Sequence, residues 1–78
     1  MVISNYTLIQ WGKGIAIDGD YLNTLPVSFL NTYSITISQD ASMNVWCYNR
    51  VVKSTLSTYK ASCSNNFEIL IYYVAVGY

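Results

Sequence analysis

Histidine is absent from this sequence, and only four acidic residues, four basic residues and two cysteines are present. Without histidine the common catalytic triads are excluded, and a structural zinc site is nearly excluded as well. Two of the acids, Asp18 and Asp20, flank a glycine. That arrangement is better explained by turn chemistry than by a catalytic pair or a calcium loop. We therefore expect no enzyme, no metal and no cofactor.

Charge of either sign is also scarce, at 10% of the residues with a formal net charge of zero, against roughly 25% in typical domains. Nucleic-acid binding needs a basic stripe, and a polybasic membrane anchor needs a Lys/Arg cluster. The longest apolar run, Ile69 to Val76, is much shorter than the roughly 18 residues of a spanning helix. We expect no nucleic-acid partner, no membrane insertion and, without a basic n-region, no signal peptide.

In place of charges, the sequence is rich in Ser, Thr and Asn and has eight tyrosines. Antibody paratopes use a similar palette for binding, but the strands of an ordinary β domain also favour Thr and Tyr. Composition alone leaves both interpretations open. A single domain over residues 1–78 has a marginal core, and partner chains are the expected source of additional stability.

Apolar residues recur at every second position in several short segments, and no segment shows a helical period. Tyr33, Ile35 and Ile37 are expected to face inward in one such segment, and Tyr59, Ala61 and Cys63 in another. Pro26 cannot donate to a ladder, so its segment is expected at a sheet edge or a bulge. Strands are expected at residues 15–17, 25–29, 33–38, 43–48, 58–63 and 69–76.

Polar turn signals separate these segments. They lie at residues 12–14, 18–20, 39–42, 49–50 and 64–66. Short strands with polar turns between them predict an all-β fold, a small antiparallel β-sandwich of about six to seven short strands.

The last predicted strand is apolar on both faces. One face carries Ile69, Ile71, Tyr73 and Ala75, and the other carries Leu70, Tyr72, Val74 and Val76. An antiparallel strand with one wet face should alternate with polar residues. We therefore expect a central strand, covered by the core of the domain on one side and by another copy of the chain on the other.

Three stretches resemble a known family when taken in order. Ile9-Gln10-Trp11-Gly12 comes first, Pro26-Val27-Ser28-Phe29 with Asn31 follows, and Tyr73-Val74-Ala75-Val76-Gly77-Tyr78 comes last. Together they resemble the C-terminal tip domain of bacteriophage tail fibres and, more distantly, the H-type lectins. Tyr73 stands where the family commonly has Trp, and residues 39–66 match no part of the family pattern.

The resemblance implies a homotrimeric β-sandwich at the distal end of a longer fibre protein. Such a domain would be assembled in the cytoplasm of the host bacterium and carried on the virion. It would bind a bacterial surface receptor, either a lipopolysaccharide sugar or an outer-membrane protein. The alternatives are a purely structural cap that nucleates fibre trimerisation and a stand-alone lectin.

Two sets of residues are candidates for binding. Binding residues tend to lie on loops of a rigid scaffold, and the polar loop candidates are Asp40, Ser42, Asn49, Arg50, Asn65 and Asn66. Each of them has the alternative of being a solvated turn residue. The aromatic candidates are Trp11, Trp46, Tyr48, Tyr72 and Tyr78. They suit a carbohydrate platform or, as the better interpretation, the trimer interface, where aromatics are enriched.

Both cysteines, Cys47 and Cys63, fall on predicted core faces. One disulfide across the sandwich is conceivable, but assembly in a reducing cytoplasm favours two buried thiols.

Overall fold

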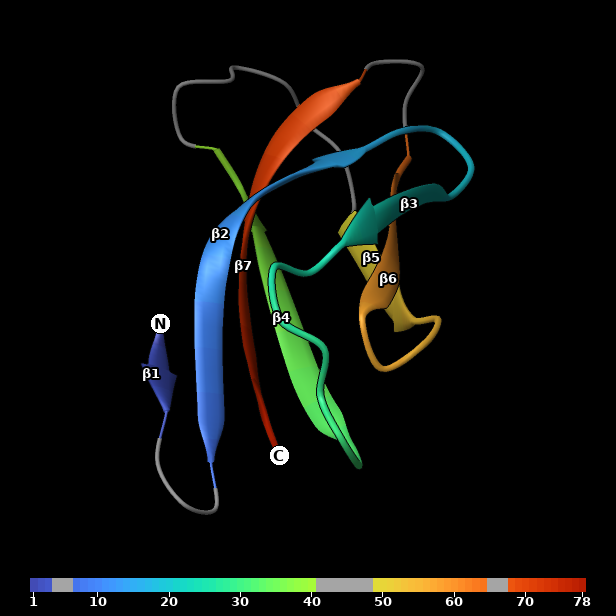
Figure 1. Ribbon diagram of the computed structural model, residues 1–78. Helices are drawn as coiled ribbons and strands as arrows, with labels where there is room; N and C mark the ends of the chain where they lie inside the picture. Colours follow the sequence, from blue (N-terminus) through green and yellow to red (C-terminus); the bar gives the residue numbers. More distant parts are fainter. Residues whose placement is uncertain (4–6, 41–48, 65–67) are drawn as a thin grey trace.

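The computed structural model describes residues 1–3, 7–40, 49–64 and 68–78. In these residues the protein is all-β, with seven strands in two antiparallel sheets (Figure 1). The strands are β1 (Val2–Ile3), β2 (Leu8–Ala16), β3 (Tyr21–Thr24), β4 (Tyr33–Gln39), β5 (Asn49–Lys53), β6 (Thr58–Cys63) and β7 (Ile69–Gly77). The predicted class and number of strands are confirmed.

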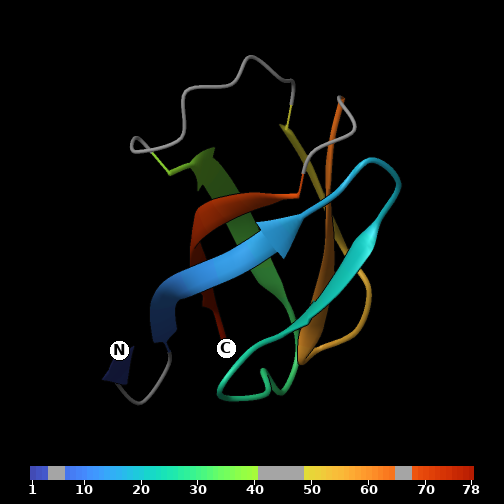
Figure 2. The same ribbon diagram turned by 90° about the horizontal axis from the view of Figure 1, so that it is seen from above.

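The two sheets form two layers (Figure 2). One has the strand order β1-β2-β7-β4, and the other has the order β3-β6-β5. Strand β7 lies between β2 and β4 and pairs antiparallel with both. The prediction that the last strand is central in its sheet is therefore confirmed.

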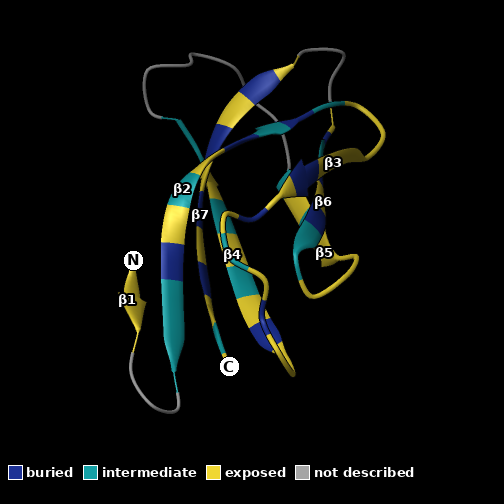
Figure 3. Ribbon diagram, in the orientation of Figure 1, coloured by how far each residue is buried: buried dark blue, intermediate teal, exposed yellow. Residues whose placement is uncertain are grey.

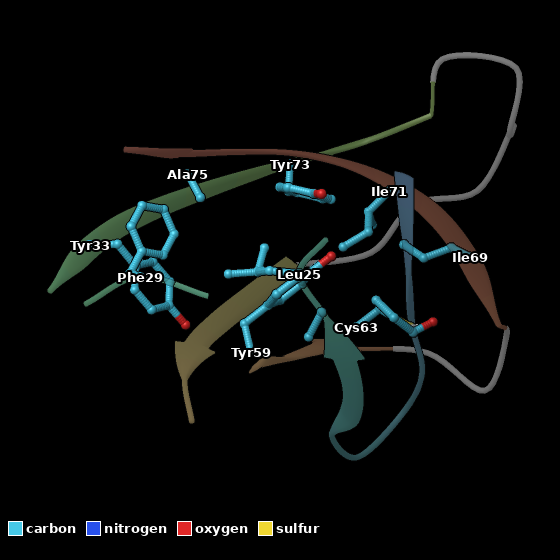
Figure 4. Close-up of a cluster of buried hydrophobic side chains, with 11 residues drawn as sticks. Leu25, Phe29, Tyr33, Tyr59, Cys63, Ile69, Ile71, Tyr73 and Ala75 are labelled. Atoms are coloured by element: carbon cyan, nitrogen blue, oxygen red, sulfur yellow. Dashed lines mark hydrogen bonds between the residues drawn. The ribbon is translucent and has the colours of Figure 1, made fainter. Parts of the chain in front are cut away.

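The core lies between the layers and follows the period of two predicted for the strands (Figure 3). Every second residue of β7 and β6 is buried, and in β4 Tyr33 is buried while Ile35 and Ile37 pack against the core. Tyr33 stacks on Phe29 with ring centroids 4.6 Å apart, and the Tyr59 and Tyr73 rings lie 5.4 Å apart (Figure 4). Large aromatic side chains from both layers therefore fill much of the core, which contains few residues in total.

The prediction of a turn at residues 12–14 is wrong, because Gly12 and Gly14 lie inside β2. Tyr73 pairs directly with Gly12 across the sheet, and its ring fills the space beside that glycine. The Tyr59 hydroxyl occupies the position that a Cβ at residue 14 would take. These glycines therefore make room for core tyrosines. They are present because the chain packs closely here, and they do not mark a turn.

Leu25 to Phe29 does not form the predicted strand, although its side chains alternate as expected, with Leu25 and Phe29 buried. The backbone makes separate hydrogen bonds from Leu25 N to the Ser57 carbonyl oxygen (2.7 Å) and from Phe29 N to the Leu56 carbonyl oxygen (2.8 Å). Pro26 between them has no N–H, and a continuous ladder is not formed.

Two further turn predictions have opposite outcomes. The turn at residues 18–20 is confirmed, with Gly19 at φ 99°, in the left-handed region that favours glycine. The turn at Asn49-Arg50 is wrong, because these residues begin β5 and pair with Cys63 and Ser62. Polar residues at a strand end resemble a turn in sequence when the strand that they begin is not recognised.

Two buried amide side chains tie segments together in the way that backbone groups do. Gln10, 1% exposed, donates from Nε2 to the Val27 carbonyl oxygen (2.8 Å), and its Oε1 accepts from Val27 N (3.2 Å). Asn23, 8% exposed, accepts at Oδ1 from Ile15 N (3.0 Å) and donates from Nδ2 to the Ile15 carbonyl oxygen (2.9 Å). Each amide closes a ring of two hydrogen bonds, which satisfies polar groups that burial would otherwise penalise.

The residue after β7 is held by backbone contacts. Tyr78 N donates to the Thr32 carbonyl oxygen (3.0 Å), and the Tyr78 carbonyl oxygen accepts from Asn31 N (2.8 Å) and Thr32 N (3.2 Å). This arrangement fixes the segment before β4 against the end of the central strand.

Cys63 is buried, and its thiol contacts the Ala16 carbonyl oxygen at 3.9 Å. Cys47 and the predicted strand 43–48 lie outside the described residues. The prediction that both thiols are reduced therefore stays a prediction.

Candidate binding surfaces

The most apolar exposed surface of the described chain is the outer face of the four-stranded sheet. Residues directly opposite one another in antiparallel strands share a face, and the register aligns Ile9, Trp11 and Ile15 of β2 with alternate residues of β7. The apolar members of this outer face are Val2, Ile9, Trp11, Ile15, Leu70, Tyr72, Val74 and Val76. On the β4 side the same face carries Ser34, Thr36 and Ser38.

The side chains of the outer face are well exposed in the isolated chain. Trp11 is 54% exposed, and the four β7 residues are 39–46% exposed. Lys13 is the one charged residue that the described strands place on this face, and its Nζ lies 5.7 Å from the centroid of the Tyr72 ring. An apolar strip bordered by hydroxyl groups suits contact with another protein surface better than contact with water.

The aromatic candidates are placed in part. Trp11 and Tyr72 lie together on the outer face. Tyr78 is 55% exposed and follows β7. Trp46 and Tyr48 lie outside the described residues.

Three of the polar loop candidates lie at neighbouring strand ends. Asp40 follows β4, where its N–H donates to the Leu70 carbonyl oxygen (3.0 Å), and Asn49 and Arg50 begin β5. The Arg50 guanidinium forms an ion pair with Asp20 (3.2 Å), and both side chains are exposed. An exposed pair of this kind contributes little to stability. Ser42, Asn65 and Asn66 lie outside the described residues.

An open groove of about 220 Å³ lies at the other end of the same strands. We call it the β5–β6 groove, because the turn between these strands forms one wall and the start of β4 forms the other. It is lined by Asn31, Thr32, Tyr33, Lys53, Ser54, Thr55 and Leu56. The sequence analysis assigned none of these residues to a binding site.

Internal hydrogen bonds fix the floor of the β5–β6 groove. The Tyr33 hydroxyl lies 2.9 Å from the Thr55 carbonyl oxygen and 2.7 Å from that of Thr58, and it can donate to either. The Thr55 and Thr58 hydroxyls are 2.6 Å apart, and Ser57 N donates to Thr55 Oγ1 (3.2 Å). Burial raises the pKa of Tyr33 above its ordinary value, and the phenol therefore stays a neutral donor at physiological pH.

The mouth of the groove carries one positive charge. Lys53 Nζ lies 5.5 Å from the centroid of the Tyr33 ring, within the range of a cation–π contact. Among the residues that the structure describes, no acidic side chain forms an ion pair with Lys53. The remaining exposed groups at the mouth are polar side chains and the half-open apolar side chain of Leu56, which is 38% exposed.

A second hollow, about 470 Å³, lies between β2 and β3 beside Lys13, Tyr21 and Leu22. Asn23, which lines it, already uses its amide on Ile15 and on the Tyr21 carbonyl oxygen (3.3 Å). The amide of Asn23 is therefore already engaged, and the other polar side chains that line this hollow are those of Lys13, Tyr21 and Thr24.

Among the described residues there is no group of three His, Cys, Asp or Glu side chains that could hold a metal ion. The same part of the chain contains no helix long and apolar enough to cross a membrane. One buried side-chain polar atom there has no hydrogen-bond partner, the Tyr59 hydroxyl, and it faces the backbone at Gly14. Burial, with smaller effects of Tyr73 and Tyr33, raises the pKa of Tyr59 strongly.

No protein-family model matches the chain, and neither the curated proteins nor the solved structures contain a match.

The sequence analysis missed the buried roles of Gln10 and Asn23 and the whole β5–β6 groove. Gln10 carried a usable signal, because its amide lies between two apolar residues, Ile9 and Trp11. The groove joins residues that are more than twenty positions apart, and no local pattern marks it.

Proposed function

We propose that the chain is a homotrimeric tip domain of a bacteriophage tail fibre that binds a receptor on the bacterial surface. The observation that carries the proposal is the exposed outer face of the four-stranded sheet, centred on β7. Two further copies of the chain are the occupants that we assign to this face.

Physical cost supports self-association at the outer face. Soluble monomers rarely expose contiguous apolar patches larger than a few hundred Å². Here a tryptophan, a tyrosine and several aliphatic side chains adjoin one another on neighbouring strands. Burial of apolar surface contributes roughly 25 cal/mol of stabilising free energy per Å². Burial of the outer face in a trimer would therefore stabilise a small domain whose own core is marginal.

The family resemblance is supported by where its three stretches lie. Gln10 of the first stretch closes a hydrogen-bonded ring with Val27 of the second. Asn31, which follows the second stretch, donates to Tyr78 of the third. Residues that recur in a family for structural reasons are expected to contact one another in this way.

The adhesive part of the proposal is supported by the remaining surface. Hydroxyl, amide and a few charged side chains border both ends of the strands, and the β5–β6 groove is concave. Short polar side chains on a rigid β scaffold suit recognition of hydroxyl-rich ligands.

Assembly is tested by a matched pair of substitutions. Val74 on the outer face and Val52 on the three-stranded sheet are each 46% exposed. Val74→Asp is expected to convert the trimer to a monomer in light scattering, because a carboxylate cannot be buried without a partner. Val52→Asp is expected to leave the trimer intact. A wild-type chain that stays monomeric at micromolar concentration would overturn the proposal.

A structural cap that trimerises a fibre without contacting the host is the second candidate. It is favoured by the fact that Gln10, Val27, Asn31 and Tyr78 all act within the scaffold. Binding of the fluorescently labelled trimer to panels of bacterial strains separates the two functions. Strain-selective adhesion supports the receptor-binding tip, whereas a trimer that adheres to none of the strains supports the cap.

A further inference from the structure

The β5–β6 groove is small, open and preformed. Its volume of about 220 Å³ is below the roughly 300–1,000 Å³ of sites for drug-sized ligands. A single ring with hydrophilic substituents fits such a groove better than an extended molecule. Because the hydroxyls of Tyr33, Thr55 and Thr58 already hold the floor, a ligand need not pay to order it.

The charge at the groove favours an anion. Lys53 is exposed and is positioned over the Tyr33 ring, which also stacks on the ring of Phe29. An ammonium held beside an aromatic ring can turn toward a carboxylate and form a charge-assisted hydrogen bond. Phosphate sites more often use an arginine fork or several converging backbone N–H groups, and the groove lining includes no arginine.

The remaining lining favours a sugar ring. The exposed Asn31 amide and Ser54 hydroxyl can bind ligand hydroxyls from opposite walls, and Leu56 offers an apolar edge for C–H groups. Together with Lys53 this set matches a ring that carries several hydroxyls, one carboxylate and an apolar edge.

We propose that the β5–β6 groove binds an acidic sugar residue of the uronic acid type, with the Lys53 ammonium on its carboxylate. The inference rests on the proposed receptor-binding function, for which it names a site and a ligand class. The groove lies at the start of β4 and the end of β5, away from the loop candidates Asp40, Asn49 and Arg50.

The test is titration of the isotope-labelled protein with glucuronate, followed by amide chemical shifts in NMR. Saturable shifts are expected at Asn31, Thr32 and residues 53–56, with millimolar affinity. Glucose and inorganic phosphate serve as matched probes and are expected to bind at least about tenfold more weakly. Glucose loses the charge-assisted hydrogen bond to Lys53, and phosphate loses the ring contacts with Asn31, Ser54 and Leu56. Equal shifts with glucose or with phosphate would overturn the ligand class.

Two lysine substitutions supply the matched variants. Lys53→Gln is expected to weaken glucuronate binding about tenfold, whereas Lys60→Gln makes the same change of charge on β6, outside the groove, and is expected to have no effect. Equal weakening by both variants, or shifts confined to residues outside the groove, would overturn the inference.

A cell-adhesion assay distinguishes an error in the proposed groove from an error in the proposed receptor-binding function. A trimer that adheres to cells equally well with and without Lys53→Gln overturns the groove as the receptor site and leaves the proposed function standing. Saturable glucuronate binding by a trimer that adheres to no strain supports the groove and overturns the receptor-binding tip.

Discussion

The two faces of β7 have almost the same composition but opposite environments. Ile69, Ile71 and Ala75 are fully buried on the inner face and Tyr73 is 4% exposed, while the residues of the outer face are 39–46% exposed. Apolarity alone therefore does not say which surface the fold itself covers. The difference arises because the second sheet covers only one side of the first.

The two faces of β7 are therefore expected to have different roles. The inner face stabilises the single chain, and the outer face is available for association. Substitutions on the inner face should change the free energy of unfolding of the monomer, whereas those on the outer face should change assembly.

The largest effect is expected from Gln10→Glu, on the inner face of β2. The substitution replaces the donor to the Val27 carbonyl oxygen with a carboxylate at a position that is 1% exposed. We expect a loss of about 3–5 kcal/mol in the free energy of unfolding, typical of an uncompensated buried charge. Urea denaturation by circular dichroism measures it.

The pH dependence of this variant provides its control. Protonation of the introduced carboxyl restores a donor, and its folded-state pKa is raised by burial. The destabilisation relative to wild type should therefore be full above that raised pKa and shrink as the pH falls below it. A destabilisation that is the same at pH 4 and pH 8 would contradict the assigned hydrogen bonds.

The second prediction compares the two faces directly. Ile71→Ala is expected to lower the free energy of unfolding by about 2–5 kcal/mol, because it leaves a cavity in the core. Val74→Ala, measured at dilutions where the chain is monomeric, is expected to change it by less than about 0.5 kcal/mol. Similar losses for the two variants would show that the outer face is covered within the single chain.

The third prediction uses the two glycines of β2. At Gly14 a Cβ would coincide with the hydroxyl of Tyr59, which is fully buried, and at Gly12 it would lie 3.1–3.3 Å from atoms of the Tyr73 side chain. Gly14→Ala is expected to cost about 1–3 kcal/mol, typical of overpacking. Gly12→Ala is expected to cost less, and thermal unfolding of both variants provides the ranking. The reverse order would refute the packing that we assign to Tyr59.

The smallest effect is expected from Tyr59→Phe. Its hydroxyl is buried without a partner among the described residues, and its removal is expected to be neutral or to stabilise the chain by about 1 kcal/mol. A loss of more than about 1 kcal/mol would imply a hydrogen bond that the structure does not show.

The buried tyrosines of the core make the stability of the fold depend on alkaline pH. Burial raises the pKa values of Tyr33, Tyr59 and Tyr73 in the folded protein, whereas unfolded tyrosines ionise near pH 10. This stability is fully present below about pH 10 and falls as the pH rises toward the folded values. Denaturation at pH 9 and pH 11 should show the fall, and Tyr59→Phe should reduce it.

Strands could be predicted from the sequence where the local pattern of residues is compatible with only one kind of structure. Alternation located β4 and β6, and the two apolar faces of residues 69–76 identified β7 as a central strand, because both signals are local. It failed at Gly12, Gly14 and Asn49, whose residue types are compatible with either a turn or a strand. The partner that decides between them is a distant tyrosine in one case and a distant strand in the other.

The candidate sites were less accessible than the fold. Trp11 and Tyr72 could be assigned to one face only after the register of β2 and β7 was known. The β5–β6 groove forms because Asn31 and Leu56 approach each other in the tertiary structure, although they are distant in the sequence. Single polar residues in loops carry too little information to identify such a concavity.

The central place of β7 also constrains when the protein can fold. Strands β2 and β4 do not pair with each other, and both hydrogen-bond to the last of the seven strands. During synthesis the four-stranded sheet therefore cannot close until residues 69–77 have left the ribosome, and contacts of high sequence separation form slowly. Until then Trp11 and Ile15 of β2 remain without their β7 partners, Val74 and Leu70, and unpaired strand edges of this kind are prone to wrong pairing. In a nascent chain only the short β1–β2 pair of this sheet can form before β7 is present.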